Sequence, residues 1–167
     1  MDIHKFLVCF HDPQEENGFL SNKYLAPMTV NGKTYSSMEQ YMMYQKAECF
    51  HDGAVGVTIM ETDDPEEIKN LGRLVCGYDE HVWNGVRQLI VYDGLMAKFT
   101  QNEDLGEKLK ATGNKFIARC SATDPSWGIG MSLDDPDRIY KEKWKGQNQL
   151  GYALMYVREK IKEEDPK

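Results

Sequence analysis

The sequence predicts an α+β fold, a helix-dominated single domain with a small, mainly antiparallel sheet. Apolar residues recur at helical spacing through several segments, the longest of which runs from Asp79 to Phe99. Asn31-Gly32 lies between two short β-prone arms, which is typical of a type I′ hairpin. The chain has 167 residues, the size of one domain with a substantial core. We therefore expect a single domain over residues 1–167, with its core at about 6–160.

The remaining elements follow from periodicity and from turn and capping residues. Short strands are predicted at residues 6–10, 115–120 and 139–144. Asp64-Pro65 begins a helix with a capping acid and a proline in its first turn. Gly85 and Gly94 interrupt the longest helix, where glycines allow a kink. Helices are expected at residues 35–50, 54–60, 64–71, 79–99, 103–111 and 145–161.

Composition excludes several classes of protein. The chain carries 27 acidic and 20 basic residues, a formal net charge of −7, which opposes the broad phosphate-neutralising surface of a duplex-binding protein but allows a local basic pocket. No apolar run approaches the roughly 18 residues of a membrane span, so we expect an intracellular, cytoplasmic protein without membrane contact. The four cysteines and four histidines show no metal-ligand spacing, so neither a metal nor another cofactor is expected.

The first candidate for chemistry is the helix that opens at residues 35–46. Glu39 and Lys46 are two turns apart and lie on the same side of a helix. A carboxylate beside an amine is a candidate catalytic pair. The alternative is structural, because Ser36-x-x-Glu39 also fits a capping box in which the glutamate binds a backbone N–H.

The second candidate is the loop that follows the predicted strand at 115–120. It carries Asp124, Trp127 and Gly128, and a rigid strand that presents polar groups on a loop is a common site geometry. The run Gly146 to Asn148 suits a helix entry whose free N–H groups hold an anion.

Two further residues have both a structural and a functional interpretation. Arg73, beside Gly72 near a helix end, is either a surface charge or a fork for a phosphate. Trp83 is either a core anchor or a flat wall for a base or sugar.

Together these motifs resemble the NADAR family, which includes the YbiA-like N-glycosidases. The matching pieces cover roughly residues 18 to 158, in the order of the family. They are Gly18-Phe19-Leu20-Ser21-Asn22, Asn31-Gly32-Lys33, Glu39-Gln40-Tyr41 with Lys46, Gly72-Arg73, Trp83, Lys98-Phe99, Asp124 with Trp127-Gly128, and Gly146-x-Asn148-x-Leu150-Gly151 with Leu154-Met155 and Arg158.

The resemblance implies a YbiA-like fold and hydrolysis of an N-glycosidic bond between a ribose and a nitrogen base. One branch of the family is similar to enzymes that remove ADP-ribose from guanine in nucleic acid, and another to enzymes that cleave ribosylamino-pyrimidine phosphates of riboflavin synthesis. The expected partner is ADP-ribosylated guanine or a related ribosyl nucleotide. The acidic net charge favours a small or single-stranded nucleic-acid substrate over a duplex, and the oligomeric state is left open.

The resemblance also implies roles for particular residues. It makes Glu39 the catalytic carboxylate and places Trp83, Asp124 and Trp127 on functional positions. Contacts to the ligand are implied for residues in the matching motifs, namely Asn22, Arg73, Gly128, Asn148 and Gly151.

The sequence departs from the YbiA-like pattern at Met43 and Tyr44, where Gln and Ala are frequent, and at Leu20, where a second aromatic is sometimes found. These departures touch the expected pocket wall and leave the substrate branch open.

Cleavage builds positive charge on the sugar, so Glu39 would stabilise that charge or activate a water, and Asp124 would be the complementary acid or base. Lys46 offers a second route, a Schiff base with an opened sugar aldehyde. A non-catalytic ADP-ribose-binding module and an interaction protein with core tryptophans remain the alternatives from other classes.

Overall fold

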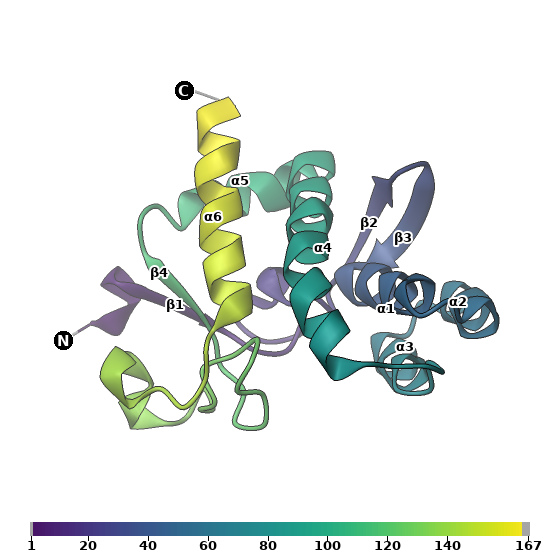
Figure 1. Cartoon of the computed structure of the whole chain (residues 1–167). Helices are drawn as coiled ribbons and strands as arrows, with labels where there is room; N and C mark the ends of the chain where they lie inside the picture. Colours follow the sequence, from purple (N-terminus) through teal and green to yellow (C-terminus); the bar gives the residue numbers. More distant parts are fainter. Residues whose placement is uncertain (1, 165–167) are drawn as a thin grey trace. The chain divides into compact units, whose positions relative to one another are not determined.

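The computed structural model describes residues 2–164 and confirms the α+β fold, with helices and two small sheets (Figure 1). These residues separate into two compact units, one of residues 2–21 with 104–164 and the other of residues 22–103. The single domain expected from the sequence stays a prediction. No helix within residues 2–164 is long and apolar enough to cross a membrane.

The unit of residues 22–103 begins with the predicted hairpin. Strands β2 (Leu25–Val30) and β3 (Lys33–Ser37) pair antiparallel. Asn31 and Gly32 have φ angles of +50° and +80°, and two consecutive positive φ angles are the requirement of a type I′ turn. The hairpin prediction is confirmed.

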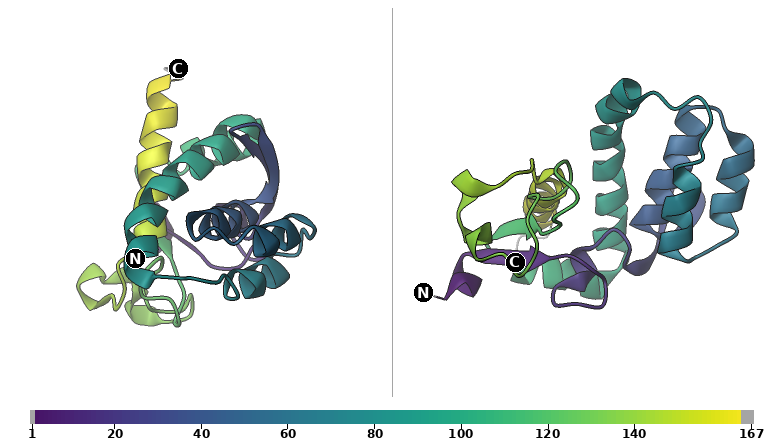
Figure 2. Two further views of the ribbon diagram at one scale, coloured as in Figure 1. Left: turned by 45° about the vertical axis from the view of Figure 1, so that its right-hand side comes forward. Right: turned by 90° about the horizontal axis from the view of Figure 1, so that it is seen from below.

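Four helices follow in this unit: α1 (Met38–Cys49), α2 (Gly53–Met60), α3 (Pro65–Gly72) and α4 (Glu80–Gln101). Helices α1, α2 and α3 lie side by side (Figure 2), around a core that includes Ala47, Ile59 and Ile68. Helix α4 is assigned as one continuous element. A Cβ on its Gly94 would lie 2.7 Å from Met38 Sδ and 2.7 Å from the Tyr41 ring, so this glycine lets α4 pack closely on α1.

The unit of residues 2–21 and 104–164 is built on a parallel strand pair. Strand β1 (Leu7–Phe10) pairs with β4 (Phe116–Arg119), with Cys9 opposite Ala118. Antiparallel pairing therefore accounts for one of the two sheets of the described chain. Helix α6 (Gln149–Glu164) packs on β4, and α5 (Glu103–Ala111) precedes that strand.

Short 3-10 helices complete the fold: η1 (Ile3–Lys5), η2 (Gly18–Leu20), η3 (Pro136–Ile139) and η4 (Lys141–Lys143). The last two replace the strand predicted at residues 139–144, which is wrong. Asp135 caps η3 by accepting a hydrogen bond from the Asp137 N–H, and Pro136 has the φ angle that a first helical turn needs. These local signals outweigh the β-prone residues that follow.

Candidate active site

The start of α1 decides whether Glu39 is a capping residue. The N-cap is Ser37, whose Oγ accepts a hydrogen bond from the Gln40 N–H at 3.1 Å. Gln40 reaches back in turn, and its Oε1 accepts from the Ser36 N–H at 2.7 Å. The capping box is therefore formed by Ser37 and Gln40, and the alternative that assigned it to Ser36 and Glu39 is wrong by one residue.

Glu39 consequently occupies the second position of α1, half-buried in the first turn. Its N–H donates to the backbone oxygen of Asn22 at 2.8 Å, which ties the chain before β2 to the helix start. The positive end of the helix macrodipole favours the ionised carboxylate at this position.

Asn22, whose backbone oxygen binds the start of α1, has a buried side-chain oxygen that lacks a hydrogen-bond donor within residues 2–164. Its side-chain Oδ1 is buried but accepts no hydrogen bond from the described residues. A buried acceptor without a donor costs about 1–3 kcal/mol, and such a group in a native structure calls for an explanation. An N–H or O–H of a bound ligand, or a water molecule, would satisfy it.

Lys46 lies two turns beyond Glu39 on the same helix. Burial lowers the pKa of Lys46, the neighbouring charge of Arg73 lowers it further, and the carboxylate of Glu39 opposes both effects. These couplings bring the three predicted site residues into one electrostatic group. A lowered pKa increases the fraction of neutral, nucleophilic amine near neutral pH.

Tyr78 is a contact of Lys46 that the sequence analysis missed. The Lys46 Nζ lies 4.4 Å from the centre of the Tyr78 ring, within the range of a cation–π interaction. Tyr78 also meets Phe50 edge-on, with ring centres 5.5 Å apart. The preceding Gly77 has φ +74°, so a glycine turn presents this tyrosine, and Gly77-Tyr78 is the one local signal for it.

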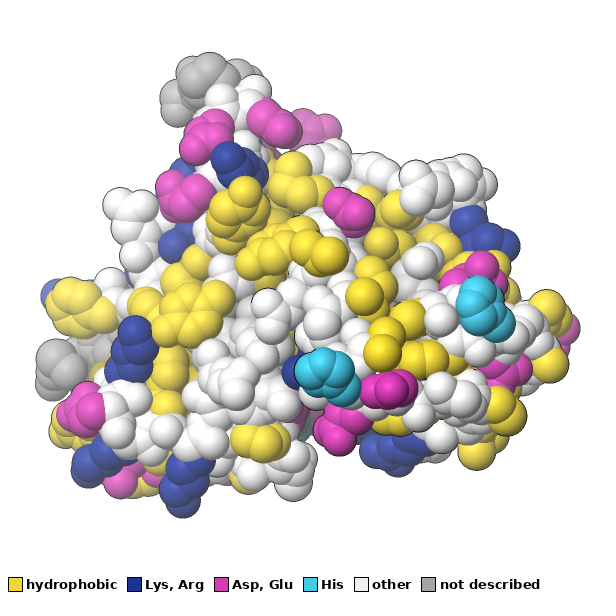
Figure 3. Space-filling model, viewed as in Figure 1, with side chains coloured by type: hydrophobic (Ala, Val, Ile, Leu, Met, Phe, Trp, Pro, Cys, Tyr) yellow, Lys and Arg dark blue, Asp and Glu magenta, His cyan; other side chains and the backbone are white. Residues whose placement is uncertain are grey.

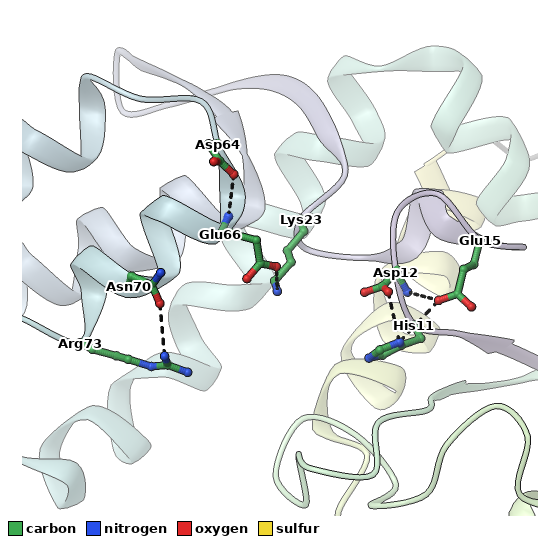
Figure 4. A network of polar contacts seen from close by, with 8 residues as sticks. All are labelled: His11, Asp12, Glu15, Lys23, Asp64, Glu66, Asn70 and Arg73. Carbon is green, nitrogen blue, oxygen red and sulfur yellow. Dashed lines mark hydrogen bonds and ion pairs between the residues drawn. The ribbon is translucent and has the colours of Figure 1, made fainter.

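Arg73 approaches α1 because of the glycine before it. A Cβ on Gly72 would lie 2.1 Å from Met43 Sδ, so the glycine lets the end of α3 pack against Met43 without moving its side chain. The Arg73 guanidinium is exposed and donates to Asn70 Oδ1 at 3.2 Å (Figure 4). Met43, a departure from the YbiA-like pattern, is thus the residue on which the end of α3 packs.

A second lysine lies near α3. Lys23 forms an ion pair with Glu66, which Figure 4 shows beside the capping residue Asp64. Lys23 lowers the pKa of the Glu66 carboxyl, and Lys69 and Arg73 add smaller effects. The N-terminal and C-terminal ends of α3 are therefore both within reach of cationic side chains.

Trp83 lies in the first turn of α4 and is only 5% exposed. A ring this buried has the surroundings of a core anchor, and stacking on a base would require its face to be uncovered. The stacking role stays a prediction.

Asp124 belongs to the other unit, where its carboxylate is heavily engaged. Oδ1 accepts from the N–H groups of Ser126 at 3.0 Å and Trp127 at 2.9 Å, and Oδ2 accepts from Arg119 Nη1 at 2.9 Å. These are the contacts of a residue that shapes a turn and ties it to the end of β4. Proton transfer by Asp124 would have to compete with them.

Asn148 is also committed to the backbone of β4. Its side chain is fully buried, with Oδ1 accepting from the Arg119 N–H at 3.0 Å and Nδ2 donating to the Ile117 oxygen at 2.9 Å. A Cβ on Gly151 would lie 2.3 Å from that Ile117 oxygen, and one on Gly128 would lie 2.9 Å from the Arg119 oxygen. The two glycines therefore allow close packing, while their predicted contacts to a ligand stay predictions.

Four N–H groups at the entry of α6, where an anion site is expected, are already hydrogen-bonded, and the anion site stays a prediction. The loop from Pro125 to Gly128 supplies four backbone oxygens, which accept from the N–H groups of residues 147–150 at 2.8–3.1 Å. With these donors already satisfied, the helix entry has a structural function.

One group of side chains in the described chain has a geometry suited to a metal ion. His11, Asp12 and Glu15 place their ligand atoms within 4.8 Å of one another (Figure 4). Exposed acids beside a histidine are equally explained by ion pairing, and the expectation of no metal stays a prediction.

Within residues 22–103 the fold thus groups Asn22, Glu39, Lys46 and Arg73, and within the other unit it groups Asp124, Trp127, Gly128, Asn148 and Gly151. Residues 9–162 match the NADAR domain. The chain belongs to the NADAR family. The resemblance inferred from the motifs is thereby confirmed.

Three relatives illustrate this membership. N-glycosidase R617 of Acanthamoeba polyphaga mimivirus is 42% identical over 75% of this chain and 74% of its own length. Riboflavin biosynthesis protein VVA0006 of Vibrio vulnificus is 31% identical over 95% of this chain but only 40% of its own length. N-glycosidase YbiA of Escherichia coli is 28% identical over 93% of this chain and 88% of its own length.

The fold of this NADAR chain is similar to the NMR structure of Escherichia coli YbiA. The TM-score is 0.79 at 28% identity, covering 97% of this chain and 88% of that one. The relatives named N-glycosidase confirm the predicted enzyme class, and the solved structure confirms the fold class.

Proposed function

We propose that this NADAR protein hydrolyses the N-glycosidic bond between a phosphorylated ribose and a nitrogen base, with ADP-ribose on guanine as the substrate. The observation that supports it best is the electrostatic group of Glu39, Lys46 and Arg73. It combines a carboxylate outside the capping box, an amine of lowered pKa and an exposed guanidinium. Each has a place in such a reaction.

In this proposal Glu39 acts at the anomeric carbon. Breaking the bond from C1′ to the base nitrogen leaves its electron pair on the nitrogen and positive charge on the sugar, which an ionised carboxylate stabilises. Water then adds to C1′ and gives up a proton, and the departing base gains one. Burial beside the helix end holds the carboxylate in place and raises the strength of its interaction.

Arg73 is assigned to the substrate phosphates, because a guanidinium binds two phosphate oxygens through parallel hydrogen bonds. Asn22 is assigned to the ribose or base, where a donor of the substrate would satisfy the buried Oδ1. We assign Asp124 and Asn148 to positioning their loop and helix, since their hydrogen bonds are already made.

Lys46 defines the alternative mechanism. Its neutral amine would add to C1′ of the ring-opened sugar and expel the base, which keeps the electron pair of the broken bond and gains a proton. The resulting Schiff base is hydrolysed by one water, which releases the sugar and regenerates the amine. In the first mechanism Lys46 instead acts through its charge, orienting Glu39 and attracting the phosphates.

The test combines two substitutions on one helix with a matched control. Glu39→Gln keeps the shape of the side chain and should lower kcat by about 10²–10⁴-fold on ADP-ribosylated guanine oligonucleotide. Glu48→Gln makes the same change at an exposed position of α1 and should leave kcat unchanged. Full activity of Glu39→Gln would refute the assignment.

Lys46 is tested by borohydride reduction during turnover. A covalent adduct in the wild type and none in Lys46→Met would support the Schiff-base route. Loss of activity without any adduct would leave Lys46 as an electrostatic partner, and full activity of Lys46→Met would remove it from the site.

A second candidate substrate is a ribosylamino-pyrimidine phosphate, favoured by the name of the Vibrio vulnificus relative. It contains the same type of bond and a phosphate for Arg73. Offering both substrates side by side decides between them. Tight calorimetric binding of ADP-ribose without turnover of either substrate would instead indicate a non-catalytic module.

A further inference from the structure

The segment from Arg138 to Lys145 concentrates basic and aromatic residues. It contains four basic residues and one acid, a formal charge of +3 within a chain of −7. Tyr140 and Trp144 alternate with the lysines. Interleaved cations and aromatic rings are the composition of a surface that binds single-stranded nucleic acid.

The fold holds this segment rigidly. The indole N–H of Trp144 donates to the Arg138 oxygen at 2.7 Å, which closes the two turns η3 and η4 into one loop. Trp144 packs against Phe116 with ring centres 5.6 Å apart, and Phe116 meets Tyr152 of α6 edge-on at 5.5 Å. The basic segment is thereby fixed beside an exposed face of α6.

Lysines and tyrosines alternate across this face. Lys141 Nζ lies 5.3 Å from the Phe116 ring and 5.7 Å from the Tyr152 ring. Tyr156 is one helical turn beyond Tyr152, and Lys160 Nζ lies 5.4 Å from its ring. We call the following set the aromatic–lysine surface: Tyr140, Lys141, Lys143, Tyr152, Tyr156 and Lys160.

The rings of this surface are accessible. Tyr140, Tyr152 and Tyr156 are 44%, 41% and 52% exposed. Figure 3 shows hydrophobic side chains along the visible face of α6, with Lys and Arg side chains over the neighbouring turns. Three half-exposed tyrosines on one face leave considerable aromatic area in contact with water.

We propose that the aromatic–lysine surface binds a single strand of nucleic acid, with bases stacked on the tyrosines and phosphates paired with the lysines. A cation–π contact at an exposed site is weaker than base–aromatic stacking. A base therefore displaces the amine from the ring, and the amine remains close enough to bind the adjacent phosphate. The surface suits a single strand because duplex bases are already stacked and an overall charge of −7 repels a long duplex.

The ion pairs of the lysines and their number both bear on which ligand binds the aromatic–lysine surface. Lys143 pairs with Asp137 at 3.0 Å and Lys160 with Glu163 at 3.4 Å, but exposed ion pairs contribute little and yield to a phosphate. Lysine is depleted at protein–protein interfaces, so its repetition here favours a nucleic acid over a second copy of the chain.

This inference deepens the proposed function, because it makes a polynucleotide the carrier of the modified guanine. Binding itself needs no turnover. An unmodified strand therefore tests the surface, whereas the glycosidase assay with Glu39→Gln tests the proposed reaction.

The experiment measures fluorescence anisotropy of labelled 15-nucleotide oligo-dT and a matched duplex with the full chain, over a range of salt concentrations. The wild type should bind the single strand more tightly than the duplex. Tyr152→Leu should weaken binding about tenfold, the loss of one stacked base. The double variant Lys141→Gln with Lys143→Gln should reduce the slope of log Kd against log salt by about 1.4, since each lost phosphate contact contributes about 0.7.

Lys33→Gln is the matched control, because Lys33 also lies over a tyrosine, at 4.8 Å from the ring of Tyr44 in the other unit. It should bind the strand like the wild type. Equal binding by the double variant and this control would overturn the proposal, as would duplex bound as tightly as single strand. A change in oligomeric state of Tyr152→Leu in sedimentation, without a change in strand binding, would assign the surface to a second copy instead.

Discussion

Glu39 and Asp124 are the two predicted catalytic acids, and their surroundings differ at the level of single hydrogen bonds. The backbone of Glu39 is held by Asn22 while Gln40 takes the capping role. The side chain of Asp124, in contrast, accepts from two backbone N–H groups and an arginine. The residue type and the neighbouring motif suggest the same chemistry for both, but the hydrogen bonds of Asp124 support a structural role for that residue.

Asp124→Asn tests this difference. Asparagine retains an Oδ1 acceptor for the Ser126 and Trp127 N–H groups but loses the charge paired with Arg119. We expect kcat to stay within a few-fold of the wild type and the free energy of unfolding to fall by about 1–2 kcal/mol, as for a lost charge-assisted hydrogen bond.

The measurements are steady-state kinetics and urea unfolding. The matched control is Asp64→Asn, at a cap that accepts one backbone hydrogen bond and should cost less stability. A hundredfold loss of kcat with unchanged stability would return Asp124 to the catalytic residues.

At the scale of elements, glycines set how closely two helices approach their neighbours. Gly72 lets α3 reach Met43 of α1, and Gly151 lets α6 reach the Ile117 oxygen of β4. The first approach places Arg73 near Lys46, and the second allows the Asn148 side chain to bridge Ile117 and Arg119. The family motifs that contain these glycines therefore encode helix packing as well as chemistry.

Gly151→Ala should destabilise the protein although alanine is the better helix former. Propensity alone favours alanine by about 1 kcal/mol, but the new Cβ would lie 2.3 Å from a backbone oxygen and 2.4 Å from Asn148 Nδ2. Overpacking of this kind costs about 1–3 kcal/mol. Because the Ile117 oxygen belongs to the backbone of a strand and cannot easily move away, we expect a cost near the upper end of this range.

Gly85→Ala on α4 is the matched control, because nothing lies within 4 Å of its added Cβ. It should stabilise the protein by up to about 1 kcal/mol in urea unfolding. Stabilisation by both substitutions would contradict the close approach of α6 to β4.

For the whole molecule, the burial of Lys98 links stability to pH. This side chain of α4 is fully buried, and burial lowers its pKa to about 7. The unfolded chain holds the lysine proton up to its ordinary pKa of 10.5, whereas the folded chain releases it above about 7. The unfolded state therefore binds more protons between these values, and stability rises with pH across that window.

Urea unfolding at pH 7, 8 and 9 should show this rise in the wild type. Lys98→Met should flatten it, because methionine has a similar length and no charge. Lys33→Met, at an exposed lysine, should keep the slope. The measurements stop at pH 9 because of Tyr35 and Tyr41, whose pKa burial raises to about 12. Near pH 10 these tyrosines begin to ionise in the unfolded chain but stay protonated in the folded one, so the stability stops rising with pH and then falls. An equal slope in Lys98→Met and the wild type would contradict this assignment.

Local signals in the sequence determined much of this protein. Asn31-Gly32 forms the hairpin because both residues tolerate positive φ, Asp64-Pro65 begins α3, and the ordered motifs identified the family. The hairpin and the start of α3 depend on interactions within a few residues. The same is true of the helical periodicity that predicted α4 and of the capping residues that predicted other helices.

Tertiary structure alone decided the rest. The one-residue difference between Ser36 and Ser37 as the cap of α1 depends on Gln40, whose Nε2 also donates to the oxygens of Ile59 and Thr62. Tyr78 reaches Lys46 through a turn 32 positions away in the chain, and Asn148 binds a strand about 30 residues earlier. Side-chain partners so distant in sequence are chosen by packing, burial and unsatisfied hydrogen bonds, which no local pattern records.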